Sequence, residues 1–462
     1  MLIQNAEVWQ TGLADLRADN SGIVAIGLLS PQAGEEVIDA GGAALLPGLH
    51  DHHIHLAATA VRRQSIVCGP PEVRAAADLA GRLQSAPGNG WLRGILYHES
   101  VAGLPDAREL DALCSHRPLR IQHRSGRMWL FNSAGLELIL TQDMPPPGLD
   151  MEHGKPTGRL FDEDTWLRTK LGNSPPDFTA VSGELAAFGV TGLTDMSPSN
   201  GPVMDVHFAK EQAAGRLLQT VRLAGTLALG SGPAKLHLHE NALPDFDETV
   251  AFVRAAHAAR RPVASHCTTE TELVFALAAI AEAGTLRGDR IEHAGIARDS
   301  HIAQMAELGL AVCGQPHFIA ERGDQYLTDV EPDLIPLLYR QASFLKAGLP
   351  LSAGSDAPFG SLDPWLAMQS AMTRQTAEGR SIGAQETLTP EQAVALYLAD
   401  PDDLSRQRTL EIGAPADLCL LNQPWQTARK SLKSHLVRAT FIGGKLVHQS
   451  PGEGFAGVQA PT

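Results

Sequence analysis

The chain of 462 residues is 44% hydrophobic and 19% charged and carries a formal net charge of −15. This composition is typical of a globular protein, and the negative charge argues against nucleic acid or an anionic membrane as a partner, since both attract basic surfaces. No apolar run approaches the ~20 residues of a membrane helix, and no basic start followed by an apolar stretch predicts a signal peptide. A small-molecule substrate is the expected partner, and the sequence leaves a homo-oligomer open.

The five cysteines indicate a reducing compartment. They are scattered along the chain, their number is odd, and no two form a Cys-X-X-Cys pair. Disulfide frameworks use even numbers of cysteines in secreted proteins. We therefore expect free thiols and a cytoplasmic location.

The first 48 residues are predicted to form short β-strands. LIQNAEVW alternates apolar and polar residues, and GIVAIG and VIDAGGAALLP follow it, each bounded by Gly, Asn or Asp. Residues 405–450, near the other end, have the same character. The simplest arrangement is a small composite β-sandwich built from 1–48 plus 405–450, with a separate domain over 49–404.

Between the two ends, apolar strand patterns alternate with helical patterns, which is typical of βα units and a parallel sheet. The eight candidate strands are 44–55, 190–197, 219–227, 234–240, 262–267, 290–295, 310–316 and 349–358. Eight such strands predict an α/β fold of the (β/α)8 type, a TIM barrel. The interval between the first and second strands is far too long for one connection, so we expect an inserted subdomain at about 60–185.

Metal-competent side chains recur at the carboxyl ends of these strands, where barrel active sites lie. They are His53, His55, Lys235, His266, His293 and Asp356. From Lys235 onward they are 31, 27 and 63 residues apart, which matches one, one and two βα units of about thirty residues. A lone histidine at a strand end is usually a core residue, but six groups in phase favour a site for zinc or another divalent first-row ion.

Several motifs resemble those of the amidohydrolase superfamily. PGLHDHHIH (47–55) matches its PGxxDxHxH opening. The resemblance is closer to the amidohydrolase 3 branch, which includes N-substituted formamide deformylase. The segments that carry it are NSAGL (132–136), PTG (156–158), QPHF (315–318), GSDAP (354–358) and GAPADLCLL (413–421).

Two segments depart from the pattern of this branch. SGR (125–127) stands where the branch usually has Asp-Gly-His, and HLHE (237–240) stands where it usually has Asp-Gly after the strand lysine. Both lie where a substrate would be contacted. They therefore bear on the identity of the substrate more than on the chemistry.

The six strand-end residues are the expected metal ligands. The second ring nitrogens of the histidines should donate to carboxylates or carbonyls, and Asp51, two residues before His53, is either such a partner or a turn residue. Asp356 resembles the catalytic aspartate of the family, which contacts metal and moves a proton from water to the leaving nitrogen. The alternative for Asp356 is a helix-capping role.

Lys235 would be electrostatically unfavourable as a cation among histidines and a dication, and burial and metal would lower the pKa of its amine. The resemblance implies that the neutral amine is carbamylated and bridges two metal ions, so that the site holds one or two zinc ions. The alternatives are a lysine that faces elsewhere and pairs with an acidic residue, or a carboxylate ligand supplied by Asp162.

Six further residues are candidates for substrate binding: His237, His239, Arg124, Arg127, Gln315 and His317. The two histidines of HLHE share a face with Lys235, and the two arginines could hold a substrate carboxylate by bidentate contact. For each of the six, the alternative is a polar rim or loop residue without a role.

These observations predict a metal-dependent hydrolase that cleaves a C–N amide-type bond, in an N-acyl, formamide or cyclic amide substrate, by a metal-bound hydroxide. A deaminase or a lactonase that uses the same hydroxide is the alternative. A non-catalytic regulator that retains the barrel would be favoured by a missing ligand, and none of the six is missing.

Overall fold

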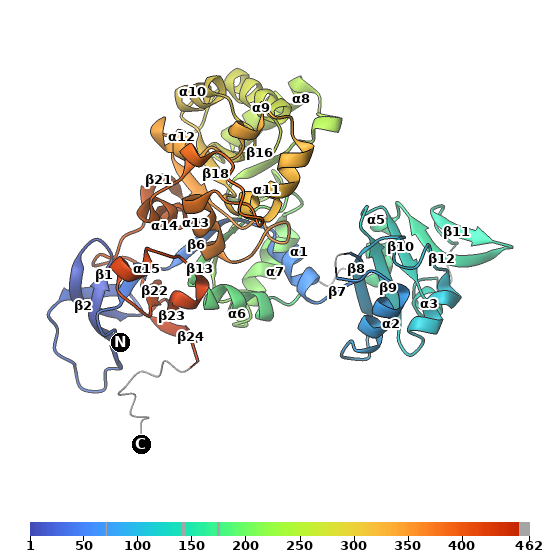
Figure 1. Cartoon of the computed structure of the whole chain (residues 1–462), viewed down its shortest axis with the longest axis horizontal. Coiled ribbons are helices and arrows are strands. Elements are labelled where there is room, and N and C mark those ends of the chain that lie inside the picture. Colours follow the sequence, from blue (N-terminus) through green and yellow to red (C-terminus); the bar gives the residue numbers. More distant parts are fainter. Residues whose placement is uncertain (71, 141–143, 173–175, 452–462) are drawn as a thin grey trace. The chain divides into compact units, whose positions relative to one another are not determined.

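The computed structural model describes residues 1–70, 72–140, 144–172 and 176–451. The chain forms two compact units, one of Met1–Leu56 with Asp177–Thr462 and the other of Ala57–Pro176. Figure 1 shows the course of the chain. Each unit has its own sheets and its own hydrophobic clusters.

The strands at the two ends of the chain pair in one sheet. Its order is β24-β23-β22-β5-β1-β2-β3, and β4 pairs with β1. The strands are β1 (Leu2–Val8), β2 (Gly12–Asp19), β3 (Gly22–Gly27), β4 (Val37–Asp39), β5 (Ala44–Pro47), β22 (Leu418–Leu421), β23 (Val437–Ile442) and β24 (Lys445–Gln449). The two ends of the chain meet where β5 pairs antiparallel with β22, with Leu46 opposite Cys419.

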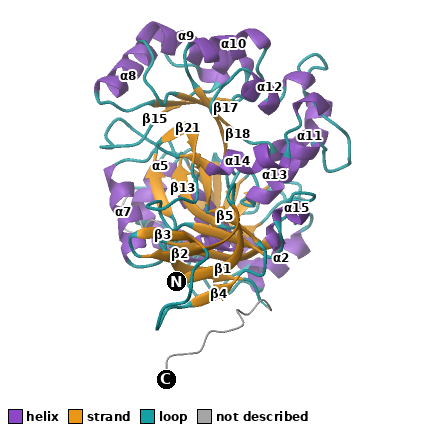
Figure 2. Cartoon of the chain, turned by 90° about the vertical axis from the view of Figure 1, so that its left-hand side faces the viewer, coloured by secondary structure: helices purple, strands orange, loops and turns teal. Residues whose placement is uncertain are grey.

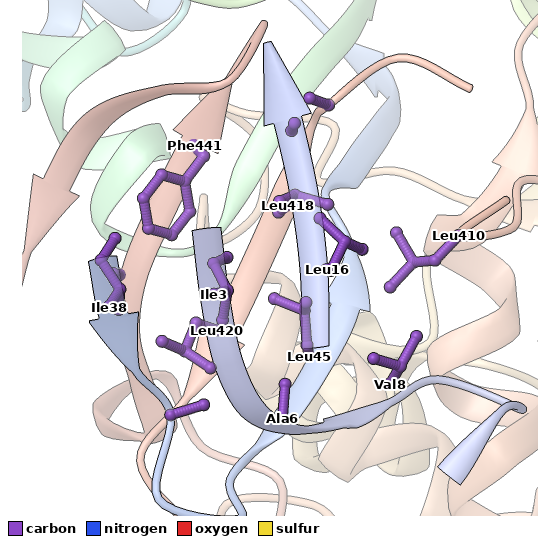
Figure 3. Close-up of a cluster of buried hydrophobic side chains, with 14 of the residues drawn as sticks. Ile3, Ala6, Val8, Leu16, Ile38, Leu45, Leu410, Leu418, Leu420 and Phe441 are labelled. Atoms are coloured by element: carbon purple, nitrogen blue, oxygen red, sulfur yellow. The ribbon is translucent and has the colours of Figure 1, made fainter. Parts of the chain in front are cut away.

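Alternating apolar residues on these strands build a shared hydrophobic cluster. Figure 3 shows Ile3, Leu45, Leu418, Leu420 and Phe441 packed together from both ends of the chain. All five are 0% exposed, and burial of each such side chain contributes roughly 1.5–3 kcal/mol. This packing explains why segments so far apart in the sequence fold together. The two-layer sandwich expected for them stays a prediction.

Within the described residues, eight parallel strands form the centre of the larger unit. They are β6 (Leu49–Ile54), β13 (Val190–Asp195), β14 (Thr220–Leu223), β15 (Ala234–His237), β16 (Val263–Cys267), β17 (Arg290–His293), β18 (Ala311–Gly314) and β19 (Leu351–Ala353). They form the sheets β14-β13-β6 and β15-β16-β17-β18-β19, and every pairing within them is parallel. The predicted α/β fold with parallel sheets is confirmed.

Backbone hydrogen bonds link the edges of these two sheets. On one side, the N–H of Lys235 donates to the carbonyl of Gly225 over 2.8 Å, and Gly225 also forms a parallel bridge with Ala234. On the other side, the N–H of Asp356 donates to the carbonyl of His53 over 2.7 Å. The end of β14 is thus connected to β15, and the end of β19 to β6.

Helices follow most of the parallel strands, and Figure 2 shows α8, α9 and α10 on the outer side of β15 and β17. The helices of this unit are α6 (Thr179–Ala187), α7 (Pro202–Ala213), α8 (Phe246–Ala258), α9 (Glu270–Ala283), α10 (Asp299–Glu307), α11 (His317–Asp329), α12 (Gln341–Lys346), α13 (Pro364–Thr373), α14 (Pro390–Leu398) and α15 (Trp425–Ala428). A hairpin of β20 (Ala399–Asp400) and β21 (Asp403–Gln407) follows α14. No helix in the described part of the chain is long and apolar enough to span a membrane.

The sequence of α9 shows why such a helix forms and where it packs. The hydroxyl of Thr269 accepts from the N–H of Glu272, and the two residues form a capping box at the first turn. Leu273, Leu277 and Ile280 lie on one face and are 0% exposed, which is the spacing of an amphipathic helix. Helices of this kind cover the apolar sheet and leave the strand ends free for polar side chains.

The unit of Ala57–Pro176 has a sheet with the order β11-β12-β10-β9-β8-β7. Its strands are β7 (Ile66–Val67), β8 (Leu92–Tyr97), β9 (Leu119–His123), β10 (Met128–Phe131), β11 (Leu149–Glu152) and β12 (Lys155–Phe161). Its helices are α2 (Ala76–Gln84), α3 (Ala107–Leu113), α4 (Ser133–Ile139) and α5 (Asp164–Leu171), and α1 (Leu56–Arg63) begins at its border. The unit lies almost entirely within the stretch predicted as an insertion.

Candidate metal centre

β6 delivers two histidines to the site. His53 is fully buried, and the side chain of His55 is 15% exposed. The pairing of β6 with β13 shifts register between Leu193 and Asp195, and irregularities of this kind re-aim side chains near active sites. The Nε2 atoms of His53 and His55 lie 3.3 and 3.2 Å from the same oxygen, Oδ1 of Asp356.

Asp356 follows β19 in a left-handed backbone conformation, with a φ of 50°, which aspartate tolerates better than most residues. A Cβ on Gly354 would lie 2.2 Å from the backbone nitrogen of His53, so glycine permits this close approach of β19 to β6. Burial alone would raise the pKa of Asp356, but the hydrogen bond from His55 and the electrostatic influence of the nearby imidazoles of His53 and His293 hold it below its ordinary value. The side chain is therefore a carboxylate.

Two further histidines face each other from neighbouring strands. The Nδ1 atom of His266 on β16 lies 2.9 Å from Nε2 of His293 on β17. The other nitrogen of His293 donates to Oε1 of Gln315 over 2.7 Å, and its ring lies 4.8 Å from that of His53 between centroids. Burial lowers the pKa of both imidazoles, that of His266 to about 2. Both rings are thus neutral, which is the form that binds a metal.

Lys235 is 6% exposed on β15. Its Nζ has no hydrogen-bond partner among the described residues, and no ion pair joins it to a described carboxylate. Burial lowers the pKa of the amine, although the charges of Glu292 and Asp356 act in the opposite direction. A buried ammonium without a partner is costly, so the site favours the neutral amine or a derivative of it. The alternative of a close pair with an acidic residue has no support in these contacts.

Glu292 is part of the site, and sequence reasoning missed it. Its Oε2 accepts a hydrogen bond from Nδ1 of His53 over 2.5 Å, and its Oε1 forms an ion pair with Nε of Arg290 over 2.5 Å. Glu292 and His53 are 0% exposed and Arg290 is 2% exposed. The available signal was the segment RIEH, which places two charged residues on a strand whose four residues are all buried.

Asp51 binds backbone, not an imidazole. Its Oδ1 accepts from the N–H of His53 over 3.1 Å and from the N–H of Ser355 over 3.0 Å. Burial raises the pKa of Asp51 to about 6, despite these hydrogen bonds. Of the two roles considered for this residue, the contacts support the structural one, because they tie β6 to the segment after β19.

The candidate substrate residues of the larger unit lie around this cluster at different depths. Gln315 and His317 are fully buried, and Nε2 of His317 donates to the carbonyl of Ser355 over 2.9 Å. Nε2 of Gln315 and Nδ1 of His317 have no partner among the described residues. His237 and His239 are exposed, and the ring of His237 lies 5.0 Å from that of His266.

Arg124, Arg127 and Asp162 belong to the unit of Ala57–Pro176. Two guanidinium nitrogens of Arg127 donate to the two carboxylate oxygens of Asp162, each over 2.7 Å. All three side chains are exposed. Within this unit Asp162 is thus occupied by Arg127, and roles for these three residues in substrate or metal binding stay predictions.

The donor atoms of the cluster fit a metal ion. The ligand atoms of His53, His55 and Asp356 lie within 4.8 Å of one another. The Nε2 of His53 and the Nζ of Lys235 are buried without a hydrogen bond among the described residues. Neutral imidazoles and a carboxylate are the ligands that zinc and similar first-row ions prefer.

The ligand atoms of a second group also lie within 4.8 Å of one another, and this group consists of His53, Glu292 and Cys313. Burial raises the pKa of the Cys313 thiol well above its ordinary value, and a metal ligand must be the thiolate. The carboxylate of Glu292 is already held by His53 and Arg290. The first group is therefore the better candidate for the metal.

Comparison with known proteins gives a consistent result. The Amidohydrolase family model matches residues 36–448. The chain is 25% identical to the N-substituted formamide deformylase of Arthrobacter pascens, over 92% of each chain, and 24% identical to the putative amidohydrolase YtcJ of Bacillus subtilis (strain 168), over 90% of each. Its fold is similar to the crystal structure of an uncharacterized metal-dependent hydrolase from Pyrococcus horikoshii OT3, with a TM-score of 0.74, 19% identity and coverage of 94% of this chain and 98% of the other.

Proposed function

Because the chain belongs to the amidohydrolase family, we propose that it is a metal-dependent hydrolase that cleaves a C–N amide-type bond in an N-acyl, formamide or cyclic amide substrate. The observation that carries this proposal is the convergence of His53, His55 and Asp356 beside the facing pair of His266 and His293. The similarity to the N-substituted formamide deformylase of Arthrobacter pascens supports the formamide as one of the substrates to test.

The proposed architecture is a closed (β/α)8 barrel over 49–404, with a β-sandwich of 1–48 plus 405–450 and an inserted subdomain at about 60–185. The backbone links of β14 to β15 and of β19 to β6 support closure of the barrel. The cluster that strands of both termini share supports the sandwich. In such a barrel, the carboxyl ends of the strands carry the chemistry.

We assign the metal site to His53, His55, His266, His293 and Asp356, with zinc as the metal. A zinc ion there would supply Lewis acidity toward water and the substrate carbonyl. Lys235 joins the site as a carbamate, formed when its neutral amine binds carbon dioxide and loses a proton, and this anion would allow two zinc ions. The burial of an unpartnered Nζ supports this assignment.

Asp356 is the proposed acid–base residue. Its lowered pKa keeps it ionised at neutral pH, so it can take a proton from the attacking water and pass it to the leaving nitrogen as the C–N bond breaks. Its Oδ1 lies 3.3 Å from Nε2 of His53 and 3.2 Å from Nε2 of His55, which places that oxygen at the cluster. A general acid is needed because an amine anion is a poor leaving group.

Substrate contacts are proposed for Gln315 and His317 inside the site and for His237 and His239 at its exposed side, while a substrate-binding role for Arg124 and Arg127 stays a prediction. Gln315 and His317 would orient the substrate, because Nε2 of Gln315 and Nδ1 of His317 are buried without a partner among the described residues. We propose the cytoplasm as the location, because all five cysteines are free and buried, as expected for a reducing compartment.

The test is a panel of N-substituted formamides, N-acyl amines, cyclic amides, aminopurines and lactones, given to the zinc-loaded protein. Release of an amine with a carboxylic acid supports the proposal. Release of ammonia from a ring amine would instead identify a deaminase, and acid formation from lactones alone would identify a lactonase. The Asp356→Asn variant, prepared in parallel, separates this site from a contaminating hydrolase.

A further inference from the structure

Two histidines stand side by side just outside the candidate metal centre. His237 ends β15, and His239 continues the extended backbone with a φ of −138° and a ψ of 123°. Leu238 between them is 0% exposed, so the two imidazoles project to the side opposite this buried anchor. Their ring centroids lie 4.3 Å apart with an interplanar angle of 68°.

Both imidazoles are available for binding. His237 and His239 are exposed, and within the described ranges neither ring forms a hydrogen bond. The histidines of the buried centre differ, because Nδ1 of His266 and Nε2 of His293 face each other at 2.9 Å. The pair therefore lies beside the centre and is not part of it.

We propose that His237 and His239 form a second, outer site for a divalent first-row metal ion, separate from the buried centre. Imidazole nitrogens suit Zn²⁺, Ni²⁺ and Cu²⁺, and the extended backbone brings two of them within reach of one ion. Water molecules would complete the coordination. The adjacent carboxylate of Glu240 accepts a hydrogen bond from Thr271 over 3.1 Å, so we assign it no part in the site.

The ring of His237 lies 5.0 Å from that of His266, and the ring of His239 lies 6.1 Å from it. A metal ion at the outer site would therefore stand directly beside the buried centre. If these imidazoles also contact substrate, excess Zn²⁺ would compete with the substrate. That consequence, unlike the site itself, rests on the proposed function.

The test uses the full chain with its retained zinc. The protein is first desalted and its zinc per chain is counted by elemental mass spectrometry. It is then dialysed to equilibrium against free Zn²⁺ and counted again. We expect one further zinc equivalent per chain after dialysis, and the His237→Ala/His239→Ala double variant should lack this increment while its retained zinc stays unchanged.

The matched control is the double variant His98→Ala/His123→Ala. It removes a different imidazole pair, whose stacked ring centroids lie 6.2 Å apart in the unit of Ala57–Pro176, and it should keep the increment. A thermal unfolding curve equal to that of the unaltered protein shows that the His237→Ala/His239→Ala variant folds. The outer site is overturned if the zinc increment persists in that variant. It is also overturned if the unaltered protein never shows the increment. Loss of the retained zinc in that variant would place the two histidines in the buried centre and would likewise overturn a separate outer site, whereas unaltered protein that retains no zinc would count against the buried centre alone.

Discussion

Nδ1 of His53 donates to Oε2 of Glu292 over 2.5 Å, between two side chains that are both 0% exposed. This contact fixes the ring so that Nε2 carries the lone pair and points toward Asp356 at 3.3 Å. Arg290 holds the other oxygen of Glu292 at 2.5 Å. The three side chains form a buried chain from guanidinium to carboxylate to the imidazole that we propose as a metal ligand, and such outer partners tune metal affinity.

Glu292→Gln should weaken metal binding by about 10–100-fold, because a neutral amide is a poorer partner for the imidazole. The variant should also lose about 3–5 kcal/mol of stability, since Arg290 is left buried and unpaired. Competition with a chromophoric chelator measures the affinity, and urea unfolding measures the stability. Glu391→Gln is the matched control, because it breaks a carboxylate–arginine pair with Arg429 away from the site. Equal metal affinity in Glu292→Gln and the unaltered protein would contradict this role.

Asp356→Asn should retain metal but lose turnover by about 10²–10⁴-fold, the usual range for removal of a general acid–base. The amide is nearly isosteric, so His53 and His55 keep their neighbour, but it cannot accept and return a proton. Metal content and turnover are measured on the same preparation. Turnover close to that of the unaltered protein would remove Asp356 from its catalytic role.

Lys235→Ala should reduce the metal content of the protein from two equivalents to one. The reason is that a carbamate on Nζ is the anionic group proposed to bridge two ions, and alanine cannot form it. Elemental mass spectrometry counts the metal, and intact mass at neutral pH should show an added carbon dioxide only when Lys235 is present. One equivalent in both proteins would indicate a mononuclear site in which Lys235 has no ligand role.

Gly354→Ala should destabilise the protein by about 1–3 kcal/mol, because the new Cβ would lie 2.2 Å from the backbone nitrogen of His53. Separation of β19 from β6 should also displace Asp356 and lower the metal affinity. Gly81→Ala is the control, since a Cβ at this position in α2 meets no atom within 4 Å and alanine stabilises a helix by about 0.5–1 kcal/mol. If Gly354→Ala were as stable as the control variant, this result would contradict the close approach of β19 to β6.

The strand-end histidines could be predicted because their spacing follows the apolar strands, and strand order alone brings His266 beside His293. Glu292 could not be found in this way, because its function depends on a contact with His53, a residue far away in the sequence. The sequence left two roles open for Asp51. Alternation of side chains along a strand predicts the face of the sheet on which a residue lies, but it does not predict which atoms its side chain contacts.

The unit of Ala57–Pro176 also shows that side-chain partners are hard to predict from sequence. The pair of Arg127 and Asp162 forms because β10 and β12 are antiparallel and bring Met128 opposite Phe161. That register follows from packing of the whole unit and is not encoded in either charged segment alone. The sequence therefore predicted which strand-end residues of the larger unit lie close together better than it predicted the partners of individual side chains.

The most direct test of the central claim is hydrolysis before and after metal removal. The protein is stripped with a chelator, dialysed, and assayed on the N-substituted formamide or N-acyl amine that the panel identifies, then assayed again after Zn²⁺ is returned. We predict that amine release stops in the stripped protein and recovers with zinc, while Asp356→Asn stays inactive throughout. Amine release that continues unchanged in protein shown to be free of metal would contradict the assignment of a metal-dependent hydrolase.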